Sequence, residues 1–93
     1  MDYLKAFKNY CEMREHQFFP EIPAKNLPEP VRQQNFRDNL KVAKYNFEKD
    51  LDKEIENIQS QAAKENNVLT LADLNQLQNI KRDAIRKFLD TYS

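Results

Sequence analysis

The residues best able to do chemistry stand close together near the start of the chain. His16 is the only histidine, and Cys11 is the only cysteine. Glu12 lies four residues before His16, so a helix would place a carboxylate and an imidazole on one face, where both can bind a metal, with Glu15 nearby. Zinc sites usually draw ligands from two elements, and the sequence offers no second cluster. We therefore expect no metal site, with His16 on the surface near a helix end and Cys11 as a small core residue.

A catalytic site is not expected either. Cys11 and His16 are five residues apart, so on a helix they point in different directions and cannot act as a nucleophile and its base. The chain contains no glycine, the residue that phosphate-binding loops and nucleophile elbows need for their tight turns. We therefore predict that the protein is not an enzyme and uses no cofactor and no small-molecule substrate.

Two pairs of acidic residues have the spacing of neighbours on a helix. Asp50 precedes Glu54 by four residues, and Asp52 precedes Glu56 by four. Di-metal sites in helical bundles use such carboxylates, but their Glu residues face inward and are followed three positions later by a histidine. The residues here belong to the polar side of the helix, so a solvated acidic face is expected.

The elements that carry these residues are predicted to be helices, so the fold class is all-α. Apolar residues recur every three or four positions over 3–18, which indicates an N-terminal amphipathic helix with Asp2 as its N-cap, within an arm over 1–19. All four prolines fall within 20–30. This range is expected to be an extended, Pro-rich connector that no helix crosses.

Residues 31–93 are predicted to form a long antiparallel helical hairpin. Over 31–64 the apolar residues form one seam, which comprises Phe36, Leu40, Ala43, Phe47, Leu51, Ile55, Ile58 and Ala62. Asn66 and Asn67 provide the turn, because Asn tolerates the left-handed conformation, and Thr70 caps a third helix. The apolar face of that helix is wide enough for more than one neighbour. The chain is expected to be a single domain, either a three-helix bundle or a dimeric bundle.

The hairpin leaves part of the long helix without a partner. If the two helices are antiparallel about residues 66–70, the third helix reaches back only to Ala43, so 31–42 project beyond it. Either the first helix folds back over this overhang or another molecule covers it. The residues predicted to contact a protein partner are Phe7, Tyr10, Phe18, Phe19, Ile22, Phe36 and Leu40. The competing interpretation is that the apolar residues of this region pack over the open side of the hairpin themselves, namely Phe18, Phe19, Ile22 and Leu27.

The function predicted from these features is that of a non-catalytic protein-binding module, such as an adaptor, an inhibitor or an assembly factor. Its partner would be another protein, a second copy of the chain, or both. An alternative is a small dimeric nucleic-acid-binding regulator that uses the basic start of the long helix, namely Arg32, Arg37, Lys41 and Lys44. The 15 basic and 15 acidic residues give zero net charge, which weakens that alternative.

Composition also predicts where the protein works. A single cysteine is typical of a reducing, cytoplasmic setting. The sequence has no run of about 20 apolar residues, so no membrane association is expected. Frequent Asn, Lys, Gln and Ile are typical of AT-rich genomes, which points to a low-GC bacterium or to its phage or plasmid.

Overall fold

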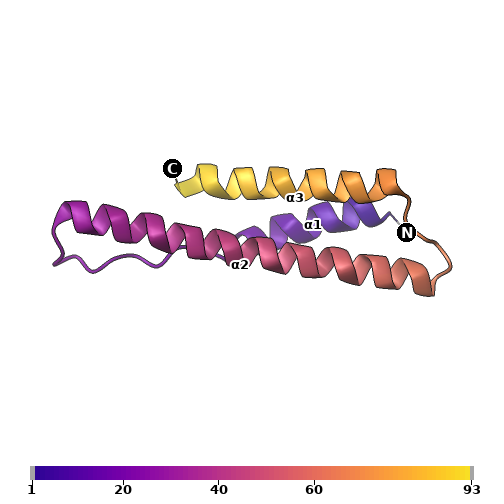
Figure 1. Ribbon diagram of the computed structural model, residues 1–93, viewed down its shortest axis with the longest axis horizontal. Helices are drawn as coiled ribbons and strands as arrows, with labels where there is room; N and C mark the ends of the chain where they lie inside the picture. Colours follow the sequence, from indigo (N-terminus) through magenta and orange to yellow (C-terminus); the bar gives the residue numbers. More distant parts are fainter. Residues whose placement is uncertain (1, 93) are drawn as a thin grey trace.

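The computed structural model describes residues 2–92. This range contains three helices and no strand (Figure 1). They are α1 (Tyr3–Glu15), α2 (Glu29–Lys64) and α3 (Leu71–Tyr92). The predicted all-α fold class is confirmed. α2 runs antiparallel to both other helices, which pack against it and against each other (Figure 1). The result is an elongated body of 57 × 18 × 18 Å.

Prolines set the start of α2. Pro28 is its N-cap, with φ −56° and ψ 145°, and Pro30 lies in the first turn. A first-turn N–H has no intrahelical acceptor, so a proline there costs no hydrogen bond and its fixed φ suits the helix. For this reason α2 begins at Glu29, two residues before the start predicted from the periodicity.

The turn between α2 and α3 has the predicted Asn residues in the predicted conformation. Asn66 has φ 56° and is the only residue with positive φ among those described. The backbone N–H of Asn67 donates to the carbonyl of Ala62 at 2.8 Å, and that of Asn66 donates to Ala63 at 3.1 Å. These two bonds form a Schellman motif, which satisfies carbonyls that the helix end leaves free.

α3 begins with a capping box. Thr70 Oγ1 accepts from the Asp73 N–H at 3.1 Å, and Asp73 Oδ2 accepts from the Thr70 N–H at 3.1 Å. The two residues thus satisfy one another's backbone donors, and the prediction of Thr70 as the N-cap is confirmed.

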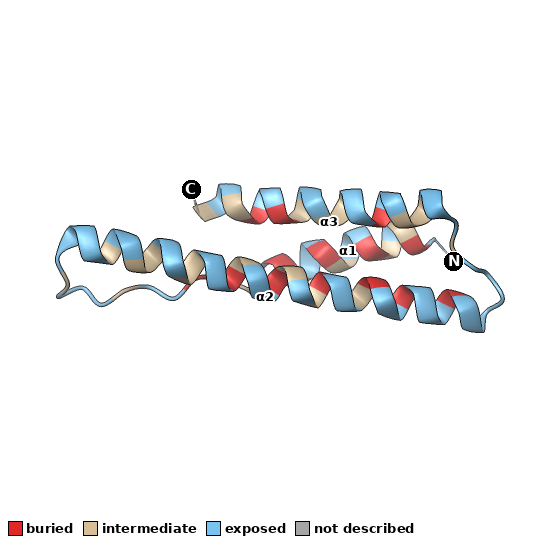
Figure 2. Ribbon diagram, viewed as in Figure 1, coloured by how far each residue is buried: buried red, intermediate tan, exposed pale blue. Residues whose placement is uncertain are grey.

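α1 folds back onto the hairpin and completes a three-helix core (Figure 2). It buries Tyr3, Phe7 and Cys11. The other core residues come from the predicted seam of α2 and from α3: Ala43, Phe47, Leu51, Ile55, Ile58, Ala62, Leu77, Ile85 and Phe88. The first helix therefore folds back onto the hairpin, but it does not cover the overhang over 31–42, which lies beyond its end (Figure 1). Cys11 is a core residue, as predicted.

α1 ends at Glu15 and not at residue 18. Gln17 N–H donates to the Arg14 carbonyl at 2.9 Å and turns the chain out of the helix. Phe19 precedes Pro20, which disfavours helical backbone at Phe19. The turn lets the Phe18 ring stack on Phe47, with 5.4 Å between ring centroids.

The N-terminal third of α2 contributes no buried residue. Burial on α2 starts at Ala43, while Phe36 and Leu40 are only half-buried (Figure 2). The interhelical segment, residues 16–28, runs back along this part of α2 (Figure 1), and Asn39 Nδ2 donates to the Glu21 carbonyl at 2.9 Å. Within residues 2–92, no helix has both the length and the apolar character needed to cross a lipid bilayer.

Candidate functional site

An open groove lies where α3 ends and α2 continues. It has a volume of about 700 Å³. Its apolar lining comes from the interhelical segment, from α2 and from the last residue of α3: Ile22, Pro23, Phe36, Leu40 and Tyr92. Tyr92 thus lines this groove together with Phe36 and Leu40, whereas the hairpin register predicted that it reaches only as far as Ala43. We call this feature the end groove.

A second groove adjoins the end groove. It is lined by Phe19, Pro20, Glu21, Ile22, Phe36 and Tyr92. Ile22, Phe36 and Tyr92 line both grooves. Of the side chains around them, Ile22 is 85% exposed and Phe19 is 66% exposed. Large apolar side chains gathered at one place with this exposure are typical of a binding surface.

Positive charge predominates among the ionisable residues of the end groove. Lys25, Arg32 and Arg37 line it together with one acidic residue, Glu29. The Nε atom of Arg32 is buried and has no hydrogen-bond partner among the described residues. The groove thus combines an apolar floor with cationic side chains, one of which has an unpaired donor.

Three of the seven predicted contact residues pack within the fold. Phe7 is 1% exposed, so it belongs to the core and is not available to a partner. Phe18 is half-buried and stacked on Phe47, as in the competing interpretation. Tyr10 is half-buried and bonded to Asp50. Phe7 and Tyr10 lie on the face of α1 that is turned towards the hairpin, and Phe18, which follows the end of α1, packs on the hairpin as well.

The other four predicted contact residues surround the grooves. Phe19 and Ile22 are exposed on the interhelical segment, and Phe36 and Leu40 are half-buried on α2. The structure brings them together with Tyr92, which was not among the predicted contact residues. The available signal was that Tyr92 belongs to the apolar face of the third helix. The predicted register placed it opposite Ala43, about one turn of α2 away from Leu40.

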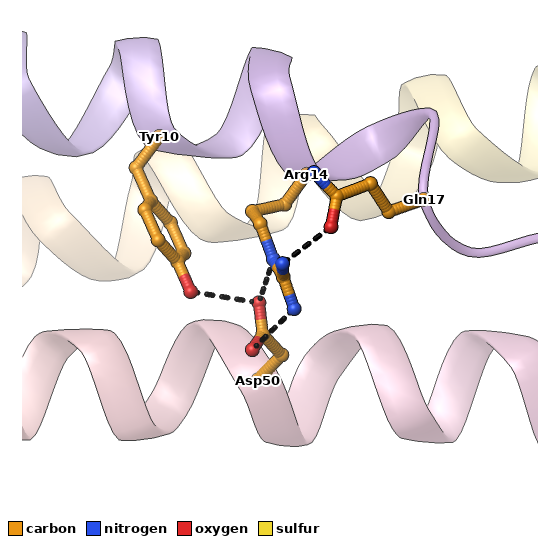
Figure 3. A network of polar contacts seen from close by, with 4 residues as sticks. All are labelled: Tyr10, Arg14, Gln17 and Asp50. Carbon is orange, nitrogen blue, oxygen red and sulfur yellow. Dashed lines mark hydrogen bonds and ion pairs between the residues drawn. The ribbon is translucent and has the colours of Figure 1, made fainter.

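A polar network joins α1 to the middle of α2 (Figure 3). Tyr10 Oη donates to Asp50 Oδ2 at 3.0 Å, and Arg14 donates to the same carboxylate from Nε at 3.0 Å and from Nη2 at 3.2 Å. Arg14 also donates to Gln17, and its guanidinium lies 5.4 Å from the ring centroid of Phe18. The network therefore fixes the end of α1 and the start of the interhelical segment.

The same network changes the properties of the groups that form it. Burial, followed by the hydrogen bond to Asp50, raises the pKa of Tyr10 to about 12. Burial and the charge of Asp50 raise the pKa of Glu54. The expectation of a solvated acidic face is therefore wrong at Asp50, because its carboxylate accepts hydrogen bonds from two side chains of α1, Tyr10 and Arg14.

Across the hairpin, an acidic residue of α2 forms an ion pair with a basic residue of α3. Lys81 Nζ lies 2.7 Å from Asp52 Oδ1. Lys87 Nζ of α3 lies 3.9 Å from the carboxylate of Glu15, so an ion pair also links α3 to α1.

The residues considered for metal binding or catalysis lie apart from the grooves. Cys11 is buried, and burial raises the pKa of its thiol to about 12. His16 is exposed at the C-cap of α1. Residues 2–92 contain no group of three or more His, Cys, Asp or Glu side chains placed to hold a metal ion.

The four basic residues of the nucleic-acid alternative do not form a separate patch. Arg32 and Arg37 line the end groove beside apolar side chains. Lys41 is exposed, and Lys44 Nζ lies 3.7 Å from the carboxylate of Glu48. Comparisons of the chain with protein families, with curated proteins and with solved structures find no match.

Proposed function

We propose that the protein is a non-catalytic protein-binding module, of the adaptor, inhibitor or assembly-factor kind, and that it binds its partner at the end groove and the adjoining groove. The observation that carries this proposal is the exposure of Ile22, at 85%, and of Phe19, at 66%, around an apolar groove that α3 leaves open. Burying two such side chains would contribute about 1.5 to 3 kcal/mol each. These two side chains would form the apolar centre of the interface.

The geometry favours recognition over chemistry. The grooves contain apolar and cationic side chains, and they contain neither His16 nor Cys11. A rigid wall supports them, because α2 is continuous from Glu29 to Lys64 and its seam is anchored in the core from Ala43 onward. A partner would therefore meet a largely preformed surface, which lowers the entropic cost of association.

Photo-crosslinking in cells of the source organism tests this proposal. A photoreactive phenylalanine analogue replaces Ile22 in one variant and Phe19 in another. Val68, which is 79% exposed at the turn between α2 and α3, carries it in the control. We expect a discrete protein adduct from both groove positions and none from the control.

Three results would contradict the proposal. They are the absence of any protein adduct, equal adducts from the position of Val68, and an adduct that nuclease removes. The last result would instead favour the nucleic-acid alternative.

A further inference from the structure

The end groove lies in line with α3 along one seam of α2. Phe36 and Leu40 continue the spacing of Ala43 and Phe47, the residues on which the bundle closes. Where α3 is present, a helix packs on that seam; beyond Tyr92 the seam continues without a helical neighbour (Figure 1). The vacant position therefore has the geometry of a helix-packing site.

The length of α2 that has no helix packed on its seam sets the length of a helix that could bind there. From Glu29 to Leu40, α2 spans twelve residues, which is about 18 Å at 1.5 Å per residue. A helix of about three turns would fill this length. Its apolar residues would recur at three- and four-residue steps in order to meet Phe36, Leu40 and the exposed Ile22.

The charges around the vacancy indicate the polar character of the occupant. Lys25, Arg32 and Arg37 face the groove with only Glu29 to offset them. Carboxylates accept from planar guanidinium groups, such as those of Arg32 and Arg37, better than neutral groups do. Acidic side chains beside the apolar stripe would thus complement the groove.

We infer that the end groove binds an acidic amphipathic helix of about three turns from another protein, collinear with α3. This inference rests on the proposed function and specifies its partner. A second copy of this chain is a poorer occupant, because a symmetric contact would bring Arg32 and Arg37 near their own equivalents with one acidic residue per copy to offset them. A nucleic acid would leave the apolar floor without a partner.

Selection from a displayed library of random peptides of about 16 residues tests the inference with the intact chain as bait. We expect the selected peptides to carry apolar residues at helical spacing with an excess of Asp and Glu. A synthetic peptide from that pool should bind at least about 10-fold more weakly to the R32E/R37E variant, because the rim charges become repulsive. Binding to the wild type should weaken between about 0.05 M and 0.5 M NaCl.

A matched control separates groove charge from net charge. The K53E/K64E variant changes the total charge equally on exposed positions of α2 outside the groove, and it should bind the acidic peptide as the wild type does. Circular dichroism confirms that both variants are folded. The acidic excess should also disappear when R32E/R37E is the bait.

Several outcomes would overturn the inference. They are selected peptides that are basic, neutral or rich in proline, equal binding to the two charge variants, and failure to select any peptide. A crosslinked adduct at Ile22 that proves to be a second copy of the chain would also overturn it, yet that adduct would support the proposed function. Loss of every protein adduct would contradict the proposed function itself.

Discussion

Phe18 and Phe19 are adjacent aromatic residues with opposite environments. Phe18 stacks on the core ring of Phe47 and lies under the guanidinium of Arg14. Phe19 is 66% exposed at the adjoining groove. Truncating the first would remove packing from the core, whereas truncating the second would remove a side chain that solvent already surrounds. Substitutions at these two adjacent positions can therefore distinguish an effect on stability from an effect on binding.

We predict that F18A lowers the free energy of unfolding by about 1 to 3 kcal/mol, because the ring is half-buried, whereas F19A changes it by less than about 0.5 kcal/mol. Urea denaturation followed by circular dichroism measures both. Only F19A should impair crosslinking from position 22 while the fold is intact. Equal stability losses would show that Phe19 is also part of the core.

Asp50 and Asp52 form another matched pair. Asp50 accepts from Tyr10 and twice from Arg14, and its side chain is 20% exposed. Asp52 forms an ion pair with Lys81, and its side chain is 54% exposed. We predict that D50A costs about 1.5 to 3 kcal/mol and that D52A costs less than about 1 kcal/mol, because exposed ion pairs are weak. Both variants replace Asp by Ala within α2 and so change helix propensity equally. The difference between their costs therefore measures the contribution of the hydrogen bonds to Asp50. Equal costs by urea denaturation would contradict its role.

At the scale of elements, α1 carries two tyrosines and a cysteine whose pKa values are raised in the folded state. Tyr10 and Cys11 have pKa values raised to about 12, chiefly by burial, and the hydrogen bond to Glu65 raises the pKa of Tyr3. All three lie on α1. A raised pKa favours the protonated group in the folded state, so its contribution is fully present below the unfolded value and is lost as pH rises through the folded value.

We therefore predict that stability falls between about pH 9, where the thiol of the unfolded chain is half ionised, and about pH 12. Detachment of α1 should accompany this fall. Unfolding by urea at several pH values measures the slope, and reaction of Cys11 with a thiol reagent measures detachment. The Y10F/C11A variant should show a shallower slope. An unchanged slope would mean that other groups cause the alkaline loss.

The elements also show which features a linear pattern can predict. Helical spacing predicted the seam from Ala43 to Ala62, and the local preferences of Asn66 and Thr70 predicted the turn and the cap. The end of α1 was placed three residues too late, because the stacking of Phe18 on Phe47 is a tertiary contact. Asp50 was assigned to solvent for the same reason, since its partners lie 36 and 40 residues away in the chain.

The candidate site was predictable to the extent that it follows from local composition. Phe19 and Ile22 stand beside prolines that keep them out of helices, and Phe36 and Leu40 lie before the stretch that α3 covers. Tyr92 was not predicted to join them, because a shift of one turn in the hairpin decides whether α3 reaches that region. Phe7 was taken for a contact residue because the choice between folding back and docking elsewhere depends on the whole molecule.

At the scale of the whole molecule, the protein is longer than a compact chain of its size. Its Cα radius of gyration is 16.5 Å, whereas a compact chain of this length would have about 12 Å. We predict that small-angle X-ray scattering at low concentration gives a radius of at least about 16 Å and a largest dimension near 57 Å. A value near 12 Å would contradict a straight α2, and a doubled dimension would indicate end-to-end pairing of two copies.

The stacking of Phe18 on Phe47 links α1 to the groove, because the segment that carries Ile22 starts at this anchor. By thermodynamic reciprocity, a ligand that binds only when the anchor is docked must tighten the anchor by the same free energy. Amide hydrogens of α1 should therefore exchange more slowly with deuterium when the groove is filled. A mutation that detaches α1 from the hairpin should weaken binding of the ligand, although α1 does not contact the ligand.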